Sequence, residues 1–372
     1  MIPTPAPHGT GAPRGASGLG PPRALRAAGP ALLVAVAFAT LIWGLAIGGG
    51  AAPLVIADPG PVVRWGLPAA QLVVNLAAAG MVGSLVLALF ALKAGEPEFD
   101  TALDTASIGA AVFTVAAGTT GFFTFVNAFN ANPSADAVFG AQLGRFLLES
   151  ELGRTWLLTT IAGAVLTVLT FAVRSWTPTL FIAILAIAAL VPMATQGHSG
   201  AEENHTAAVM ALVLHIIAAA VWLGGLILVI VVRPVVSRER IAVILTRYSS
   251  IALVAFVVVA ISGFARATIG VGAWYRLRLI GKLGQDAAPG LGALRPFDKL
   301  RTTQAQEPRS DEASRRFWSL IALELAFMGI ASGAAAALAR TAPPGTSALP
   351  EIGSPAEVLT GAPLPPELTF ER

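Results

Sequence analysis

Eight long apolar stretches constrain the fold of this chain more than any other feature. A helix needs about 20 residues to cross the hydrocarbon core of a bilayer, and no alternation of apolar and polar residues competes with the helical interpretation. The sequence therefore predicts an all-α polytopic transmembrane bundle of about eight membrane helices. They are expected at residues 31–49, 68–92, 106–129, 155–174, 178–196, 206–232, 245–267 and 317–340.

The composition agrees with a chain that is surrounded by lipid. It is 55% hydrophobic and 12% charged, whereas soluble domains are roughly 25% charged. Because cysteine is absent, disulfides, zinc–thiolate sites and iron–sulfur clusters are excluded. The net charge of +3 is small and the basic residues cluster in loops, which favours a topology signal over nucleic-acid binding. We therefore expect the lipid bilayer as a partner, and no nucleic acid.

Three regions follow from the distribution of Pro, Gly and apolar residues. Residues 1–29 are rich in Pro, Gly and Ala and predict a disordered cytoplasmic tail, and residues 30–340 contain the membrane domain. Residues 341–372 predict a Pro/Gly-rich tail or a junction. Because short cytoplasmic loops carry an excess of Lys and Arg, we expect a multi-pass protein of the cytoplasmic membrane with its N-terminus inside.

The rule that cytoplasmic loops carry the excess of Lys and Arg fails near the C-terminus. Residues 283–316 form a polar, basic loop that should be cytoplasmic. Alternation of the preceding seven segments instead places this loop outside. One more helix before the last segment would restore the alternation. Because the sequence offers no such helix, we expect a last segment that is inverted or poorly inserted.

The stretch QGHSGAEENHTAAVMALVLHIIAAAVWLGGL, residues 196–226, holds three of the four histidines. Ionisable groups are rare in membrane segments and usually functional, so the histidines indicate a metal or haem site. His205 and His215 are ten residues apart, or ~15 Å along a straight helix. Metal–imidazole bonds measure ~2 Å, so the two rings cannot share one ion unless the helix unwinds. The histidines therefore indicate two separate binding positions. We call them the outer place, in the polar loop at the membrane surface, and the inner place, within the membrane.

The outer place contains His198 and His205, with Met193, Glu202 and Glu203 nearby. Imidazole and thioether ligands suit copper, and carboxylates broaden the choice of metal. The alternative is a solvated polar loop.

The inner place centres on His215, which lies ~13 Å into its helix, and Trp222 follows on the same face. A neutral histidine that hydrogen-bonds a neighbouring helix is the competing interpretation.

Glu324 lies in the last apolar segment, and a carboxylate there should find a partner such as His215, Arg266 or a bound cation. The alternative interpretation of Glu324 is that it makes only a structural hydrogen bond. Gly224 and Gly225 most simply permit close helix packing.

The sequence carries no motif of a soluble enzyme. G-x-S-x-G, a Walker loop and H-E-x-x-H are all missing, so we expect no enzyme and no self-contained ATP-driven pump.

The pattern of residues 196–226 resembles the signature of the copper resistance protein D (CopD) family: G-H, a polar loop, a second His, then L-H followed by W-x-G-G-L. The pieces ISGFARATIGVGAWYRL and LIALELAFMGIASGAAAALARTAPP also match, and the resemblance covers roughly residues 65–340. It implies copper transport, import or resistance at the cytoplasmic membrane. It places the metal ligands at His198, His205, His215 and Met193, and more loosely at Glu324, with support from Trp222.

Two further expectations follow from the resemblance. Family members carry an apolar segment between residues 279 and 316, where this chain is polar, so one helix has apparently been lost. The tail SPAEVLTGAPLPPELTFER looks like a junction to an absent second domain, similar to the CtaG family linked to cytochrome c oxidase assembly. An oxidase-assembly domain or a periplasmic copper protein is therefore an expected partner.

Two other functions compete with copper transport. One is a haem-b membrane cytochrome, although two bis-histidine haems would need four intramembrane histidines and His215 is the only clear one. The other is a scaffold for cytochrome c oxidase assembly that moves no metal.

Overall fold

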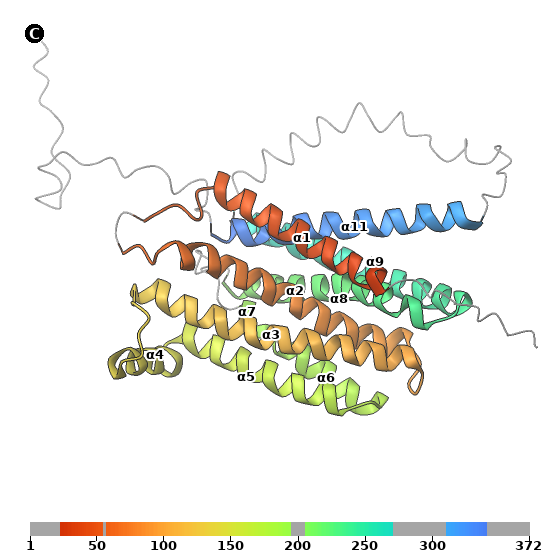
Figure 1. Ribbon diagram of the computed structural model, residues 1–372, viewed down its shortest axis with the longest axis horizontal. Helices are drawn as coiled ribbons and strands as arrows, with labels where there is room; N and C mark the ends of the chain where they lie inside the picture. The colour runs from red at the N-terminus through yellow and green to blue at the C-terminus, as the bar shows by residue number, and fades with distance from the viewer. Residues whose placement is uncertain (1–22, 55–56, 195–204, 271–309, 341–372) are drawn as a thin grey trace, which may run out of the picture.

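The computed structural model describes residues 23–54, 57–194, 205–270 and 310–340 (Figure 1). Within these ranges the chain forms helices joined by turns, and no strand. Eight of these helical segments are long and apolar enough to cross a membrane, which confirms the predicted all-α bundle. They are Ala28–Ile47, Pro61–Ala91, Pro97–Phe129, Glu151–Ala172, Trp176–Ala194, Thr206–Val235, Arg238–Ala265 and Arg316–Leu338.

The helices begin and end at turn signals that the sequence carries. Pro61 and Pro97 each occupy the first turn of a helix, where the missing N–H costs nothing. The elements are α1 (Arg23–Ile47), α2 (Pro61–Ala91), α3 (Pro97–Phe129), α4 (Ala137–Glu149), α5 (Glu151–Ala172), α6 (Trp176–Ala188), α7 (Val191–Ala194), α8 (His205–Val232), the 3-10 turn η2 (Arg233–Val235), α9 (Arg238–Gly270) and α11 (Ser310–Leu338).

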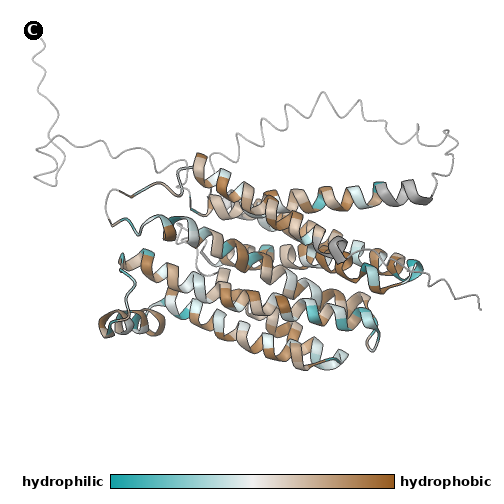
Figure 2. Cartoon of the chain, in the orientation of Figure 1, coloured by the Kyte–Doolittle hydropathy of each residue, from teal (hydrophilic) through white to brown (hydrophobic). Residues whose placement is uncertain are grey.

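Helix α2 is the centre of the bundle, and 67% of its most apolar stretch is buried. It packs against α3 on one side and α8 on the other, while α5 covers α3 and α9 covers α8. Helices α1 and α11 form a closely packed pair on the bundle. Figure 2 shows apolar residues along the lengths of the helices and hydrophilic residues at several of the turns.

We call the end of the bundle at which α1 begins the base, and the opposite end the top. Gly29 of α1 lies against Ile230 of α8, so α8 ends at the base. Helix α9 then returns from base to top, because His215 of α8 meets Ser262 of α9 while Gly225 meets Tyr248.

Helix α11 runs in the same direction as α1. Their contacts advance together along both helices, from Gly29 with Leu325, through Ala37 with Gly333, to Gly44 with Ala337. Helices α9 and α11 therefore both run from base to top. The last segment therefore does not alternate with the one before it. The sequence analysis expected an inverted last segment, which would alternate with α9 and run from top to base, and the contacts between α11 and α1 contradict that orientation.

Helix α4 was not predicted, because it is short and lies between the apolar stretches expected at 106–129 and 155–174. It lies at the top beside the ends of α3 and α5 (Figure 1). Its Phe139 and Phe146 pack on Phe125 of α3. Asp136 caps the helix by accepting a hydrogen bond from Phe139 N at 2.6 Å. The Ser134 hydroxyl, which donates to the same carboxylate, holds the pKa of Asp136 below its usual range.

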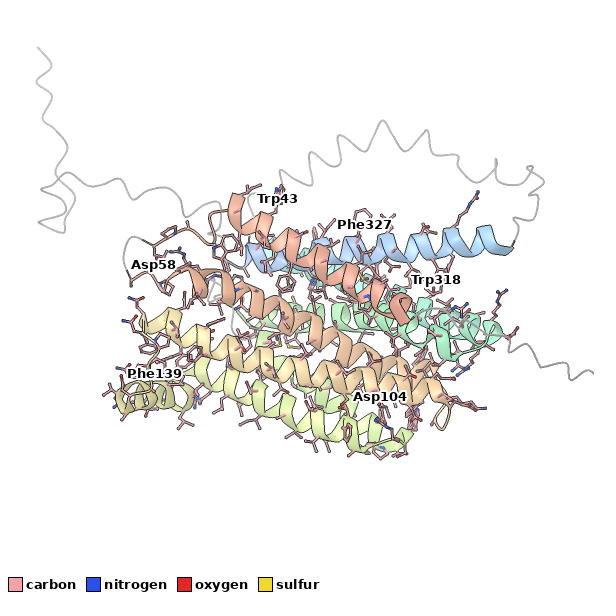
Figure 3. All side chains as sticks on the ribbon, viewed as in Figure 1. Trp43, Asp58, Asp104, Phe139, Trp318 and Phe327 are labelled. Carbon is pink, nitrogen blue, oxygen red and sulfur yellow. The ribbon has the colours of Figure 1, made fainter. Side chains whose placement is uncertain are left out.

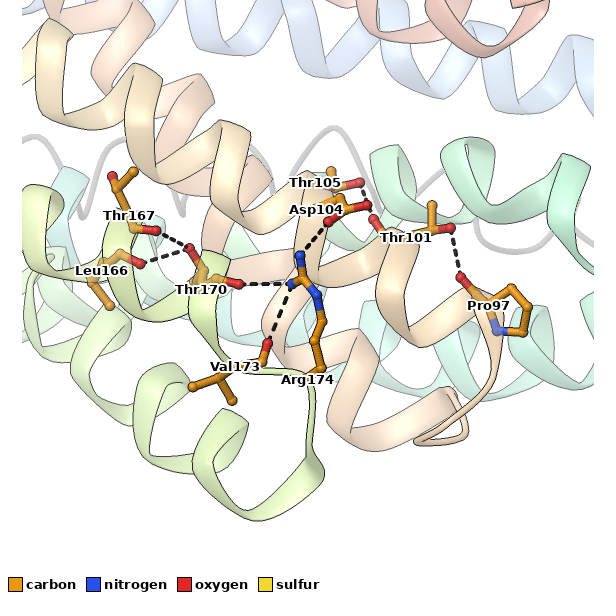
Figure 4. A network of polar contacts seen from close by, with 9 residues as sticks. All are labelled: Pro97, Thr101, Asp104, Thr105, Leu166, Thr167, Thr170, Val173 and Arg174. Carbon is orange, nitrogen blue, oxygen red and sulfur yellow. Dashed lines mark hydrogen bonds and ion pairs between the residues drawn. The ribbon is translucent and has the colours of Figure 1, made fainter.

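Polar side chains tie the helices together at the base. The last carbonyls of α2 accept hydrogen bonds from three other side chains: Leu89 from Trp176, Phe90 from Arg247 and Ala91 from Arg240. Arg240 also pairs with the buried Glu98 at 2.8 Å. Figure 4 shows a second, more exposed pair, in which Arg174 donates to Asp104 at 2.7 Å and to two carbonyls of α5 and its C-cap.

Several predicted regions lie outside the described residues. They include residues 1–22 of the predicted tail, although α1 already begins at Arg23. They also include nearly all of the basic loop at 283–316, with the place of the expected lost helix, and the final segment 341–372.

Candidate functional site

His215 lies in the membrane-spanning part of α8 and makes a hydrogen bond across the bundle. Its Nδ1 atom is 3.2 Å from the hydroxyl of Ser262 on α9, and Ser262 is 4% exposed. Gly263 lies beside the ring, since a Cβ there would be 3.5 Å from His215 Cε1. A small residue at this position therefore leaves room for the imidazole between α8 and α9.

The Ser262 hydroxyl has three hydrogen-bond partners within reach: Nδ1 of His215 and the carbonyl oxygens of Val258 and Val259. The shortest of these contacts, 2.6 Å, joins the hydroxyl to the Val258 carbonyl, one turn back in α9. A hydroxyl that donates to this carbonyl accepts from Nδ1–H of a neutral His215. In this tautomer Nε2 carries the lone pair, and a neutral imidazole with its lone pair on Nε2 is a common metal ligand.

Glu324 lies in the membrane-spanning part of α11 and is half-buried. Its Oε1 atom accepts a hydrogen bond of 3.0 Å from Nε1 of Trp222 on α8. The carboxylate was expected to find His215, Arg266 or a cation. The partner in the structure is instead Trp222, and the Arg266 side chain lies outside the described residues.

Tyr248 and Phe256 of α9 hold Trp222 in place. The buried Tyr248 hydroxyl donates to the Trp222 carbonyl at 3.1 Å, and the Phe256 ring meets the indole edge to face at a centroid distance of 5.5 Å. Gly225 lets Tyr248 approach, because a Cβ there would lie 2.8 Å from Tyr248 Cε2. The indole is therefore held between α9 and α11.

Gly224 brings α8 directly onto α2. A Cβ at Gly224 would lie 1.7 Å from the carbonyl oxygen of Ala79, and one at Gly83 would lie 2.4 Å from the Gly224 backbone. This confirms that Gly224 and Gly225 permit close helix packing, as the sequence predicted. It also fixes α8, with both His215 and Trp222, against the centre of the bundle.

These polar groups lie at different depths along α8. His205 begins the helix at the top and His215 follows after ten residues, or ~15 Å. Trp222, which holds Glu324, follows after another seven residues, or ~10 Å. These spacings are several times longer than a metal–ligand bond of ~2 Å, so the groups form successive levels rather than one closed site.

The outer place is only partly described. His198, Glu202 and Glu203 lie outside the described residues, and of His205 only the backbone is placed. Met193 lies in α7, half-buried, and packs on the hydrophobic core. Among the side chains that the structure describes, no three His, Asp or Glu residues lie close enough together to hold a metal ion.

Comparison with known protein families gives one match. Residues 58–208 match the family described as copper resistance protein D-like, N-terminal domain. Over these residues the chain matches that family, as the sequence predicted. Comparisons with curated proteins and with solved structures yield no match.

The copper resistance protein D-like domain confirms the predicted resemblance over α2 to α7 and the start of α8. Met193, His198 and His205 lie within it, whereas His215, Trp222 and Glu324 lie beyond its last matched residue. Ser262 and Tyr248 were missed by the sequence analysis. Ser262 follows His215 by 47 residues, and nothing in the sequence relates one to the other.

Proposed function

We propose that this copper-handling membrane protein moves copper ions through its bundle along α8, from the top toward the base. The copper resistance protein D-like domain supports copper as the cargo. The observation that carries the proposal is the pair of polar groups inside the apolar bundle, His215 with Ser262 and Glu324 with Trp222. Such groups are costly in a membrane and mark ion pathways.

The chemistry of these groups suits transfer better than storage. The outer ligands would be His198, His205 and Met193, which would capture the ion at the top. His215 would offer its imidazole, and Glu324 of α11, which lies beside Trp222 two turns further along α8, would offer its carboxylate. Imidazole, thioether and carboxylate ligands bind copper, and levels with at most three ligands each allow the ion to leave as well as to enter.

The distribution of basic residues supports entry from outside the cell. Ten of the described basic residues lie at the base: Arg23, Arg26, Lys93, Arg174, Arg233, Arg238, Arg240, Arg247, Arg315 and Arg316. Five lie at the top: Arg64, Arg145, Arg154, Arg266 and Arg340. Cytoplasmic ends are richer in Lys and Arg, so the base would be cytoplasmic and the top would face outward. A periplasmic copper protein would then deliver the ion to the top, and the protein itself would have no catalytic role.

Metal analysis of the purified protein tests this proposal. We expect bound copper in the unmodified protein, and about tenfold weaker binding when His198 and His205 are both changed to Ala, since each removed ligand costs affinity. A matched control is Arg145→Gln, an exposed residue of α4 at the same end. Equal copper binding by the double variant and the unmodified protein would contradict the proposal.

The visible absorption spectrum of the same sample tests the haem alternative. A Soret band with sharp bands at longer wavelength would favour an electron carrier. Stable co-purification with an oxidase-assembly protein, without bound copper, would favour a scaffold.

A further inference from the structure

A cavity of about 400 Å³ lies at the base between α1, α11 and the end of α8 with η2. This volume falls within the range of about 300–1,000 Å³ that is typical of ligand pockets. The buried side chains of Ile230, Ile321 and Leu325 form apolar walls of the cavity, with exposed fractions of 8%, 7% and 1%. The cavity is distinct from the polar groups of the proposed copper path, because none of those residues lines it.

Arg233 is the one charged residue among the described residues that line this cavity. It is half-buried in η2, where the chain turns from α8 to α9. No hydrogen bond or ion pair joins its side chain to the part of the chain that the structure describes. A guanidinium beside hydrocarbon is matched best by a phosphate, which accepts two parallel hydrogen bonds from it.

The cavity borders on the surface that lipid covers. Leu32, at its edge, is 38% exposed, and its neighbour Val34 is 42% exposed on the same apolar helix. Trp318 lines the cavity from α11, and Figure 3 places it near the start of α1. Tryptophan is enriched at the level of lipid headgroups, so the cavity lies where an acyl chain and its headgroup meet.

We propose that this cavity binds one acyl chain of an anionic phospholipid, with the lipid phosphate held by Arg233. The apolar walls exclude a soluble anion as the main ligand, because such an ion would leave most of the cavity unfilled. Basic pockets between membrane helices bind anionic headgroups by the same combination of charge and apolar surface. The bound lipid would join α1 and α11 to the α8–α9 turn.

Native mass spectrometry of the full-length purified protein tests the proposal. The protein is equilibrated with phosphatidylglycerol or with phosphatidylcholine of the same acyl chains, and the retained lipid is counted. We expect the unmodified protein to retain phosphatidylglycerol in preference. Arg233→Gln should weaken that retention at least about tenfold, because it removes the charge and leaves at most one of the two hydrogen bonds to the phosphate.

Two further variants distinguish lipid binding in the cavity from general electrostatic attraction of anionic lipid to basic residues. Arg238→Gln removes an exposed arginine five residues away and should leave retention unchanged. Ala322→Phe fills the cavity while keeping every charge, and it should reduce retention as strongly as Arg233→Gln. If this variant does not fold, as judged by circular dichroism, Ala322→Leu replaces it.

Four results would overturn the proposal. The first is equal retention of both lipids by the unmodified protein. The second is an equal loss in Arg238→Gln and Arg233→Gln, which would show only diffuse attraction. The third is unchanged retention when the cavity is filled, which would mean that the chain itself or another molecule occupies it. The fourth is displacement of the lipid by millimolar inorganic phosphate, which would assign the site to a soluble anion.

Discussion

Two ionisable side chains inside the bundle, His215 and Glu324, each have a partner on another helix. The sequence predicts that His215 and Glu324 need partners, because an ionisable group in a membrane is otherwise costly. It does not predict which partners, since Ser262 is 47 residues from His215 and Trp222 is 102 residues from Glu324. Only the packing of α8 against α9 and α11 brings these residues together.

Ser262→Ala tests the role of the hydroxyl that orients His215. The change removes the acceptor for Nδ1–H but keeps the imidazole, so copper affinity should fall about tenfold, as for other groups that orient a metal ligand. Ser250→Ala is the control, because Ser250 lies on the same helix and donates only to a carbonyl of its own helix. Equal copper affinity of the two variants in a competition titration would contradict this role.

A double-mutant cycle tests the bond between Trp222 and Glu324. Trp222→Phe and Glu324→Gln each weaken or remove it, and their effects on the free energy of unfolding should differ from additivity by about 1 kcal/mol. Reversible unfolding in mixed detergent micelles measures this coupling. Additive effects would mean that the 3.0 Å contact contributes no stability.

At the scale of helices, small residues determine which faces meet. The sequence predicts that Gly224 packs closely, but it does not identify Gly83 and Ala79 of α2 as the surface that it meets. Helix α11 carries the spacing Gly329-x-x-x-Gly333, which is typical of close helix pairs, and both glycines touch α1. That spacing was visible in the sequence and could have predicted the pairing of α11 with another helix.

Gly224→Ala should destabilise the protein by about 1–3 kcal/mol, the usual cost of forcing an extra methyl group into a packed interface. The reason is that the new Cβ would lie 1.7 Å from a backbone oxygen of α2. Gly80→Ala is the matched control, since nothing lies within 4 Å of a Cβ there. Thermal unfolding of both variants measures the difference, and equal melting temperatures would refute the close approach.

Arg240 connects α9 to α2 and α3 at the base. Arg240→Met leaves Glu98, whose side chain is 7% exposed, without its ion pair, and should cost about 3 kcal/mol. Arg174→Met is the control, because the pair it breaks is largely exposed and should cost about 1 kcal/mol or less. Adding Glu98→Leu to the Arg240 variant should restore much of the stability. No recovery in chemical unfolding would contradict the burial argument.

At the scale of the whole molecule, the sequence predicts the eight membrane segments but not their arrangement. Length and hydropathy are local properties, so each segment can be found on its own. The direction of α11 depends on its contacts with α1, which are distant in the sequence. The sequence indicated only that alternation fails near residues 283–316, because the basic loop there conflicts with the orientation rule.

Single-cysteine labelling tests the common direction of α9 and α11. The chain contains no cysteine, so each variant carries one thiol. We expect Ala339→Cys and Asn132→Cys to be labelled from the same side of the membrane, and Ser237→Cys from the opposite side. In a bundle with eight alternating crossings, Ala339→Cys would instead be labelled together with Ser237→Cys.

Copper uptake by vesicles that contain the purified protein tests the central claim most directly. Because the label-accessible residues define the two sides, copper can be offered to the top and counted inside the vesicle. We predict uptake by the unmodified protein, and at least tenfold slower uptake by His215→Ala and by Glu324→Gln, with Arg145→Gln as an active control. Uptake by both variants at the rate of the unmodified protein, or no uptake above empty vesicles by any of them, would contradict a copper path along α8.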